Sequence, residues 1–428
     1  MAEQKGEWMM QSYDFLLDLA LILLSTKVLG LVTRRFHMPQ VVGALLAGLV
    51  LGPAILGILK ETEFISMLSE VGVITLMFSA GLETDMQEMK KAGKACFIVA
   101  LIGVIVPLIG GFLLATVFNQ GGEDVSAPVY LQNIFIGVIL TATSVSITVE
   151  TLREIGKLNT PAGNTILGAA VIDDVLGIIA LTLITSMADT SVNIGMTLLQ
   201  IVLFFVFAIV IGIIFNKLFE KYQEHYNKDM RRFVILAFVF CLLLSFCAEK
   251  FFGVADITGA YLAGVIISNT QRKQYISRRF ETINYAFLSP IFFASVGLKV
   301  TLPSMSGTII LFAVLLCVIA VITKVIGCGF GAKLCKMTNH ESLQVGVGMI
   351  SRGEVALIVA TKGASLGLMS STLFGPVVIV VIVTTILAPI LLKVVFKDKN
   401  KGGAGTGEPA IPRTDGYALI EKQAGENK

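Results

Sequence analysis

Two adjacent aspartates in the middle of an apolar stretch are the residues best placed to do chemistry in this chain. Asp173 and Asp174 lie within residues 166–181, where every other residue is apolar or glycine. A stretch of this composition is typical of a helix that crosses a bilayer. Placing one carboxylate at the centre of such a helix costs about 2.5–3.5 kcal/mol, so two in succession are expected to be functional.

The two aspartates are expected to have different partners. Neighbouring residues on a helix project about 100° apart, so Asp173 and Asp174 cannot face the same group. One can be tied to a counter-charge while the other faces a water-filled cavity. Lys324, inside the mainly apolar segment 321–327, is the expected counter-charge, because an ammonium within the bilayer is unfavourable without an anion. A pair of this kind can also serve only to fix helix packing.

A carboxylate inside the membrane can hold either a proton or a metal cation, but not both at once. This competition is enough for exchange, because the same oxygen atoms carry a cation in one direction and protons in the other. Hard cations such as sodium prefer oxygen ligands, by analogy with calcium and magnesium. Thr141, Thr143, Ser144 and backbone carbonyls released by a helix break can supply them, although such hydroxyls also pack helices together.

A second charged group lies within another apolar segment. Arg352 and Glu354 flank Gly353 in the middle of that segment. We expect the two charges to neutralise each other or a neighbour such as Glu150, which is the structural interpretation. Their place at a helix break also makes them candidates for a gate.

The composition indicates a polytopic helical membrane protein. Of the 428 residues, 55% are hydrophobic and only 15% are charged, whereas soluble proteins carry about 25% charged residues. Apolar runs long enough to span a bilayer recur along the chain, and a β-barrel would show short alternating segments instead. The net charge of +3 indicates no nucleic-acid partner. The six cysteines form no metal-binding motif, and we expect no cofactor.

The hydropathy pattern predicts thirteen transmembrane spans followed by a polar, flexible tail at residues 397–428. The expected limits are 13–33, 39–58, 64–82, 94–118, 132–152, 161–187, 194–218, 231–250, 255–270, 283–299, 306–332, 341–362 and 371–396. Most lysines and arginines fall in alternate loops, for example at Arg34, Arg153 and Arg231. By the positive-inside rule, the N-terminus is expected outside and the C-terminal tail in the cytoplasm.

The fifth and twelfth spans resemble each other. Residues 137–148 (GVILTATSVSIT) and 346–357 (GVGMISRGEVAL) are both apolar helices interrupted by a polar cluster. They lie seven spans apart, so they cross the membrane in opposite directions. This pattern predicts an inverted repeat of spans 4–6 and 11–13, with two crossed broken helices. Such breaks are the best indication in a sequence of a transporter site.

At these residues the chain resembles the bacterial monovalent cation/proton antiporter superfamily. The resemblance rests on residues 141–157 (TATSVSITVETLREIGK), 172–175 (IDDV), 292–298 (FFASVGL) and 351–355 (SRGEV). The Asp-Asp pair is similar to the sodium/proton antiporter branch of the Nap and spore-germination type. Glutathione-gated potassium efflux relatives carry Gln-Asp there, and the electroneutral branch carries Asn-Asp.

The resemblance implies an all-α antiporter fold in a bacterial inner membrane. The membrane domain, residues 1–396, is expected to contain a mobile core at about 94–187 and 306–396. A dimerisation panel is expected at about 13–82 and 194–299, which implies a homodimer.

The resemblance also implies the roles of the site residues. Asp174 is expected to carry the sodium ion and the proton, and Asp173 is expected to pair with Lys324. Asp173 and Thr143 are further candidate sodium ligands. Exchange is expected to be electrogenic, with two protons for one sodium ion.

Three alternative functions stay open to different degrees. Potassium/proton exchange uses the same chemistry, and lithium is a further candidate cation. A cation channel is less favoured, because no TVGYG-like filter segment is present. An enzyme is not indicated, because the chain has no HExxH, nucleophile-elbow or P-loop motif.

Overall fold

The computed structural model of the chain describes residues 13–36, 38–84, 86–119, 125, 127–188, 194–225, 231–300 and 306–397. The helices in chain order are α2 (Asp14–Arg35), α3 (Gln40–Leu51), α4 (Glu63–Glu83), α5 (Met86–Phe118), α6 (Val129–Thr141), α7 (Val145–Glu154), α8 (Pro161–Ala188), α9 (Ile194–His225), α10 (Arg231–Phe252), α11 (Asp256–Ile267), α12 (Lys273–Ile283), the π-helical η1 (Asn284–Leu288), α13 (Ser289–Leu298), α14 (Gly307–Leu334), α15 (Asn339–Gly348), α16 (Glu354–Ser365) and α17 (Ser371–Val395). The predicted tail, apart from Lys397, lies outside the described residues.

The all-α fold predicted from the sequence is confirmed. Each of the thirteen predicted spans overlaps one helix or a run of two or three consecutive helices. Within the described residues, nine helical segments are long and apolar enough to cross a membrane, and α3 and α11 are shorter apolar helices. The predicted interruptions are also present, because α6 gives way to α7 at residues 142–144 and α15 gives way to α16 at residues 349–353.

The tenth span begins earlier than predicted. We expected it to start at residue 283, but the helix starts at Lys273 and passes through the π-helical turn η1 into α13. The Asn284 side chain donates to the Thr75 carbonyl at 3.1 Å and to Ser79 Oγ at 3.0 Å. These bonds anchor the turn to α4, whereas hydropathy marks the turn and the apolar residues after it and leaves out the polar helix α12 before it.

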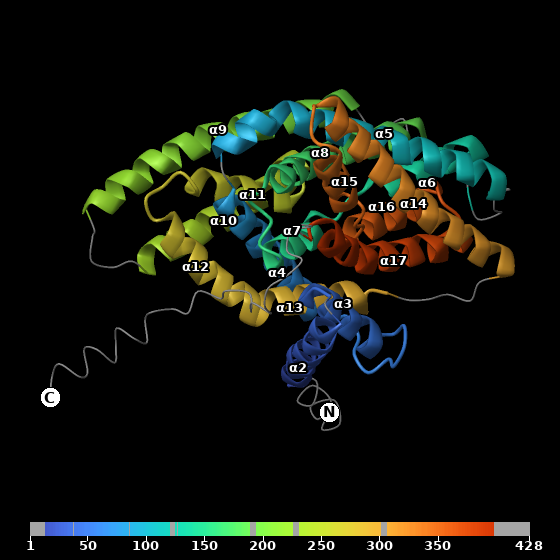
Figure 1. Cartoon of the computed structure of the whole chain (residues 1–428), viewed down its shortest axis with the longest axis horizontal. Helices are drawn as coiled ribbons and strands as arrows, with labels where there is room; N and C mark the ends of the chain where they lie inside the picture. Colours follow the sequence, from blue (N-terminus) through green and yellow to red (C-terminus); the bar gives the residue numbers. More distant parts are fainter. Residues whose placement is uncertain are drawn as a thin grey trace, which may run out of the picture. The chain divides into compact units, whose positions relative to one another are not determined.

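Two sets of helices can be distinguished by their neighbours. In the core set, α5 packs on α6, α8 and α14, and α14 also packs on α15 and α17. Figure 1 shows α14, α16 and α17 in orange and red beside α5 and α6. In the panel set, α4 packs on α11 and α13, α3 packs on α2 and α13, and α10 packs on α11. All of these helices belong to a single compact unit that ends at Phe396.

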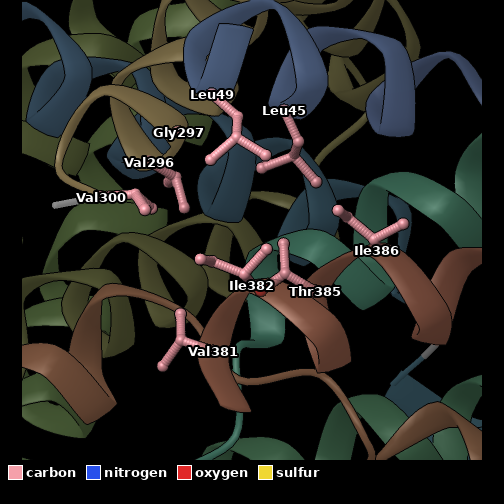
Figure 2. Close-up of a pocket in the computed structure, with 9 residues that line it drawn as sticks. All are labelled: Leu45, Leu49, Val296, Gly297, Val300, Val381, Ile382, Thr385 and Ile386. Carbon is pink, nitrogen blue, oxygen red and sulfur yellow. The ribbon is translucent and has the colours of Figure 1, made fainter. Parts of the chain in front are cut away.

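The seam between the sets is lined by aliphatic side chains where α17 faces α3 and α13. Figure 2 shows a small pocket at this place. Its lining residues are Leu45, Leu49, Val296, Gly297, Val300, Val381, Ile382, Thr385 and Ile386. Such a surface offers dispersion contacts and few directional bonds, so it constrains the register of the two sets only weakly.

Helices of the panel set approach one another closely where glycines meet. A Cβ on Gly264 of α11 would overlap the carbonyl oxygen of Phe78 on α4, and a Cβ on Gly81 would overlap the carbonyl oxygen of Tyr261. Close approach of this kind is how helices associate in lipid, where hydrophobic burial supplies little driving force.

We predict that Gly264→Ala destabilises the protein, because the added methyl group meets backbone that cannot move aside. Overpacking of this kind costs about 1–3 kcal/mol. Thermal unfolding of the purified protein in detergent measures the effect. Gly93→Ala in α5 is the control, since a Cβ there meets open space, and alanine favours a helix over glycine. Equal melting temperatures for the two variants would contradict the prediction.

Candidate functional site

The two helix breaks lie against each other and bond to each other. The Ser144 N–H donates to the Ser351 carbonyl at 2.7 Å, and Ser351 Oγ donates to the Ser144 carbonyl at 2.8 Å. Thr148 Oγ1 donates to the Gly348 carbonyl at 2.8 Å. A Cβ on Gly353 would lie only 2.7 Å from Ser144 Oγ, so a larger residue there would displace this hydroxyl. Each break thus provides hydrogen-bond partners for backbone groups of the other break.

Arg352 binds the remaining carbonyls of the crossing. Its side chain is fully buried. One guanidinium nitrogen donates to the Ile350 carbonyl at 2.8 Å, and another donates to the carbonyls of Leu140 at 2.7 Å and Ala320 at 3.1 Å. Leu140 and Ile350 lie where α6 and α15 end, and the C-terminal ends of helices carry partial negative charge. The guanidinium therefore compensates two helix ends at once.

The expected ion pair between Arg352 and Glu150 is wrong. Glu150 instead accepts from Arg153 at 2.9 Å, three residues along the same helix. The partners of Arg352 are backbone carbonyls, which are available because the helices are broken there. The Glu354 side chain lies outside the described residues, although its backbone begins α16.

The expected contact between Asp173 and Lys324 is present. Lys324 Nζ lies 3.1 Å from Asp173 Oδ1 and 3.3 Å from Oδ2. Asp173 is 2% exposed and Lys324 is 0% exposed, so both charges are removed from water. At such burial neither charge is stable without the other.

Asp174 has different surroundings from Asp173. It is half-buried, like most residues from Val171 to Thr182, whereas residues 162–170 of α8 are all buried. Asp173 is the buried exception in the half-buried stretch. The chain therefore separates the two carboxylates as the helical geometry requires, with one inside the core set and the other nearer its boundary.

The hydroxyls near the break differ in how they are used. Thr141 Oγ1 donates to the Val138 carbonyl at 2.7 Å, and Ser144 Oγ lies 3.3 Å from Ser146 Oγ. Thr143 is buried beside the Asp173 carboxylate, but its hydroxyl makes no hydrogen bond of ordinary geometry within the part of the chain that the structure describes. Thr143 is therefore the predicted hydroxyl that the structure places beside the Asp173 carboxylate.

Sequence reasoning missed one polar residue of the crossing. Thr385, within the apolar helix α17, donates its hydroxyl to the Arg352 carbonyl. It also borders the pocket of Figure 2, which is apolar and is not the site of the aspartates. The adjacent threonines 384 and 385 in an otherwise apolar helix were the available signal.

Comparison with known proteins gives consistent matches over most of the chain. Residues 20–398 match the family model described as "Sodium/hydrogen exchanger, transmembrane". The "Na(+)/H(+)-K(+) antiporter GerN" of Bacillus cereus is 42% identical over 390 residues, which are 91% of this chain and 98% of that protein. The "Na(+)/H(+) antiporter" of Enterococcus hirae is 37% identical over 384 residues, 89% and 97% of the two chains. The solved structure of the sodium proton antiporter MjNhaP1 from Methanocaldococcus jannaschii shares the fold, with a TM-score of 0.64 at 18% identity over 90% of this chain and 97% of that one.

We predict that Asp173→Asn and Lys324→Gln each lower stability by about 3–5 kcal/mol, because each leaves a buried charge unpaired. The double variant replaces the ion pair by an amide pair and should lose less than the sum of the single losses. Thermal melts of the four proteins form the double-mutant cycle. The more exposed pair Glu61–Lys299, whose side chains are 24% and 31% exposed, is changed to glutamines as the control and should lose about 1 kcal/mol or less. Additive losses at Asp173 and Lys324 would exclude direct coupling.

Proposed function

The chain belongs to the family of transmembrane sodium/hydrogen exchangers, and we propose that it is a secondary antiporter that exchanges sodium ions for protons. This agrees with the family resemblance seen in the sequence. The observation that carries the proposal is the buried pair of Asp173 and Lys324 directly beside Asp174, at the crossing of two broken helices. A static membrane scaffold has no need of a second intramembrane carboxylate at that place.

The side chains of the site divide the work as follows. Asp174 carries either the sodium ion or a proton, because it is the less buried of the two carboxylates. Thr143 supplies a neutral oxygen ligand, since its buried hydroxyl lies beside the Asp173 carboxylate. Asp173 is held by Lys324 and completes the oxygen set when that contact loosens. Lys324 then holds or releases a second proton. Arg352 keeps the two breaks in register and takes no part in ion transfer.

We assign the core set to a moving body and the panel set to a dimerisation scaffold in a homodimer. The contacts within each set support this division. Alternating access then follows from movement of the core set, which carries the crossing and both aspartates. The distribution of lysine and arginine supports a bacterial inner membrane with the N-terminus outside and the tail in the cytoplasm.

Potassium is the second candidate cation. The name of the Bacillus cereus relative includes potassium as well as sodium. Dye-monitored proton movement in proteoliposomes, with sodium, potassium and lithium chloride added in turn, tests the substrate. Sodium should give the response at the lowest concentration, and a response to potassium alone would make the chain a potassium/proton antiporter.

We predict that Asp174→Asn abolishes sodium-dependent proton flux while the protein still folds. The amide has the shape of the carboxylate, but it carries no negative charge, so it cannot take up a proton or attract a cation as the carboxylate does. Asp18→Asn is the matched control, because Asp18 is an equally half-buried aspartate on another spanning helix, α2. The control should exchange at the unmodified rate. Retained flux in correctly folded Asp174→Asn protein would remove Asp174 from the mechanism.

We predict that the apparent KM for sodium rises as the pH falls. Protonation removes the negative charge that attracts the cation, so protons and sodium compete for the same oxygen atoms. Initial rates in proteoliposomes at a series of pH values, with sodium varied at each, measure this dependence. Maximal turnover at saturating sodium should change less than KM on the acid side. A KM that is constant from acid to alkaline pH would refute the competition.

We predict that exchange is electrogenic, with two protons moved for each sodium ion. Asp174 provides one proton site and Lys324 the other, so one net charge crosses per cycle. This charge couples transport to the membrane potential by about 2.3 kcal/mol per 100 mV. A sodium concentration jump on proteoliposomes adsorbed to a solid-supported membrane should give a transient current. Proton flux without current would show electroneutral exchange and would rule out Lys324 as a proton carrier.

A further inference from the structure

Helix α7 joins the ion site to the seam between the two sets of helices. Its first residue, Val145, follows Ser144, which bonds to the opposite break at Ser351. Its last residue is Glu154, and the whole helix has only ten residues. Helix α7 packs on α8 and α17 of the core set, and its far end bonds to helices of the panel set.

Glu154 caps a helix of the panel set. Both of its carboxylate oxygens accept from the Gln40 N–H, at 2.8 and 2.7 Å. Gln40 is the first residue of α3, and the residue before it, Pro39, provides no side-chain cap. The first N–H groups of a helix have no partner within the helix, and they favour an anion. The core set therefore supplies the anion that the N-terminus of α3 lacks.

Arg153 makes the second bond across the seam. Its Nε lies 3.1 Å from Glu83 Oε1, at the end of α4 in the panel set. Its Nη1 lies 2.9 Å from Glu150 Oε2 in its own helix, which orients the guanidinium toward the seam. The three side chains are between 17% and 25% exposed. The guanidinium therefore links the two sets through a directional, charged contact.

Elsewhere along the seam the contact is of a different kind. Where α17 faces α3 and α13 the lining is aliphatic, and the contact can slide (Figure 2). If the core set moved past the panel set, aliphatic side chains would still face each other at that surface. The same movement would have to break the bonds of Arg153 and Glu154.

We propose that Arg153 and Glu154 form a latch that holds the core set against α3 and α4 in the conformation shown, and that opens once in every transport cycle. The inference rests on the proposed function, because it needs a core set that moves. The ten-residue length of α7 couples the latch to the crossing, so a change in ion occupancy at the break is transmitted to the seam.

Cross-linking tests whether the latch opens. Gln40→Cys with Glu154→Cys places thiols on both sides of the seam, and a short membrane-permeant bis-methanethiosulfonate joins them in proteoliposomes. The latch predicts complete loss of sodium-dependent proton flux on cross-linking and full recovery with dithiothreitol. Glu61→Cys with Lys299→Cys is the matched control, because Glu61 and Lys299 lie 3.2 Å apart within the panel set. Cross-linking of that pair should leave exchange unchanged.

Thiol labelling tests whether Arg153 keeps the seam closed. A Gln40→Cys protein should react faster with a water-soluble maleimide when Arg153→Gln is added, and Lys157→Gln is the control, since it changes a neighbouring charge. An equal labelling rate with and without Arg153 would overturn the latch.

The outcomes separate the latch from the proposed function. Undiminished exchange in a fully cross-linked Gln40–Glu154 protein would show a static contact and overturn the latch, while the antiporter assignment would stand. Absence of sodium-dependent proton flux in the unmodified chain would instead overturn the proposed function. The labelling measurement decides on the latch even if the double cysteine variant is inactive before cross-linking.

Discussion

The structure depends on one constraint, which is that a helix interrupted inside a bilayer must find partners for its backbone groups without water. The chain meets it by crossing two interrupted helices so that Ser144 and Ser351 bond reciprocally. The Arg352 guanidinium then donates to further carbonyls at the breaks, among them that of Leu140. The Thr385 hydroxyl in turn donates to the backbone carbonyl of Arg352. The crossing is consequently held together by hydrogen bonds at its centre. The position of the proposed ion site follows from this arrangement, because α8 brings Asp173 beside Thr143 at one of the breaks.

The burial of one carboxylate makes the other useful. Asp173 is neutralised by Lys324 and is almost completely buried. Asp174, one residue later, projects in another direction and is half-buried. A single carboxylate at this depth could not both neutralise Lys324 and bind a cation. In the proposed mechanism two adjacent carboxylates divide these tasks, and the lysine that stabilises the first becomes a proton site when the first engages a cation.

Local patterns in the sequence predicted the spans, both breaks and Lys324 as a counter-charge, and the family resemblance implied that its partner is Asp173. Hydropathy reports span length, and a polar cluster within an apolar run reports a break, so both are visible without tertiary structure. The partners of Arg352 were not visible. Glu354 is close in sequence, yet the guanidinium binds carbonyls 212 and 32 positions away. The contact of Arg153 with Glu83, 70 residues apart, was hidden for the same reason. Charged residues at helix ends are common, so the sequence does not show which of them form ion pairs. The packing of α7 on α4 shows that Arg153 pairs with Glu83.

In the proposed mechanism sodium and protons exchange on the same carboxylate oxygens. Isothermal titration of the purified protein with sodium, repeated in two buffers of different ionisation enthalpy, measures the protons released per ion bound. Protons should be released on sodium binding, and the release should decrease toward high pH, where the site is already deprotonated. Sodium binding with no proton release at any pH would contradict it, because the cation and the proton would then occupy separate sites.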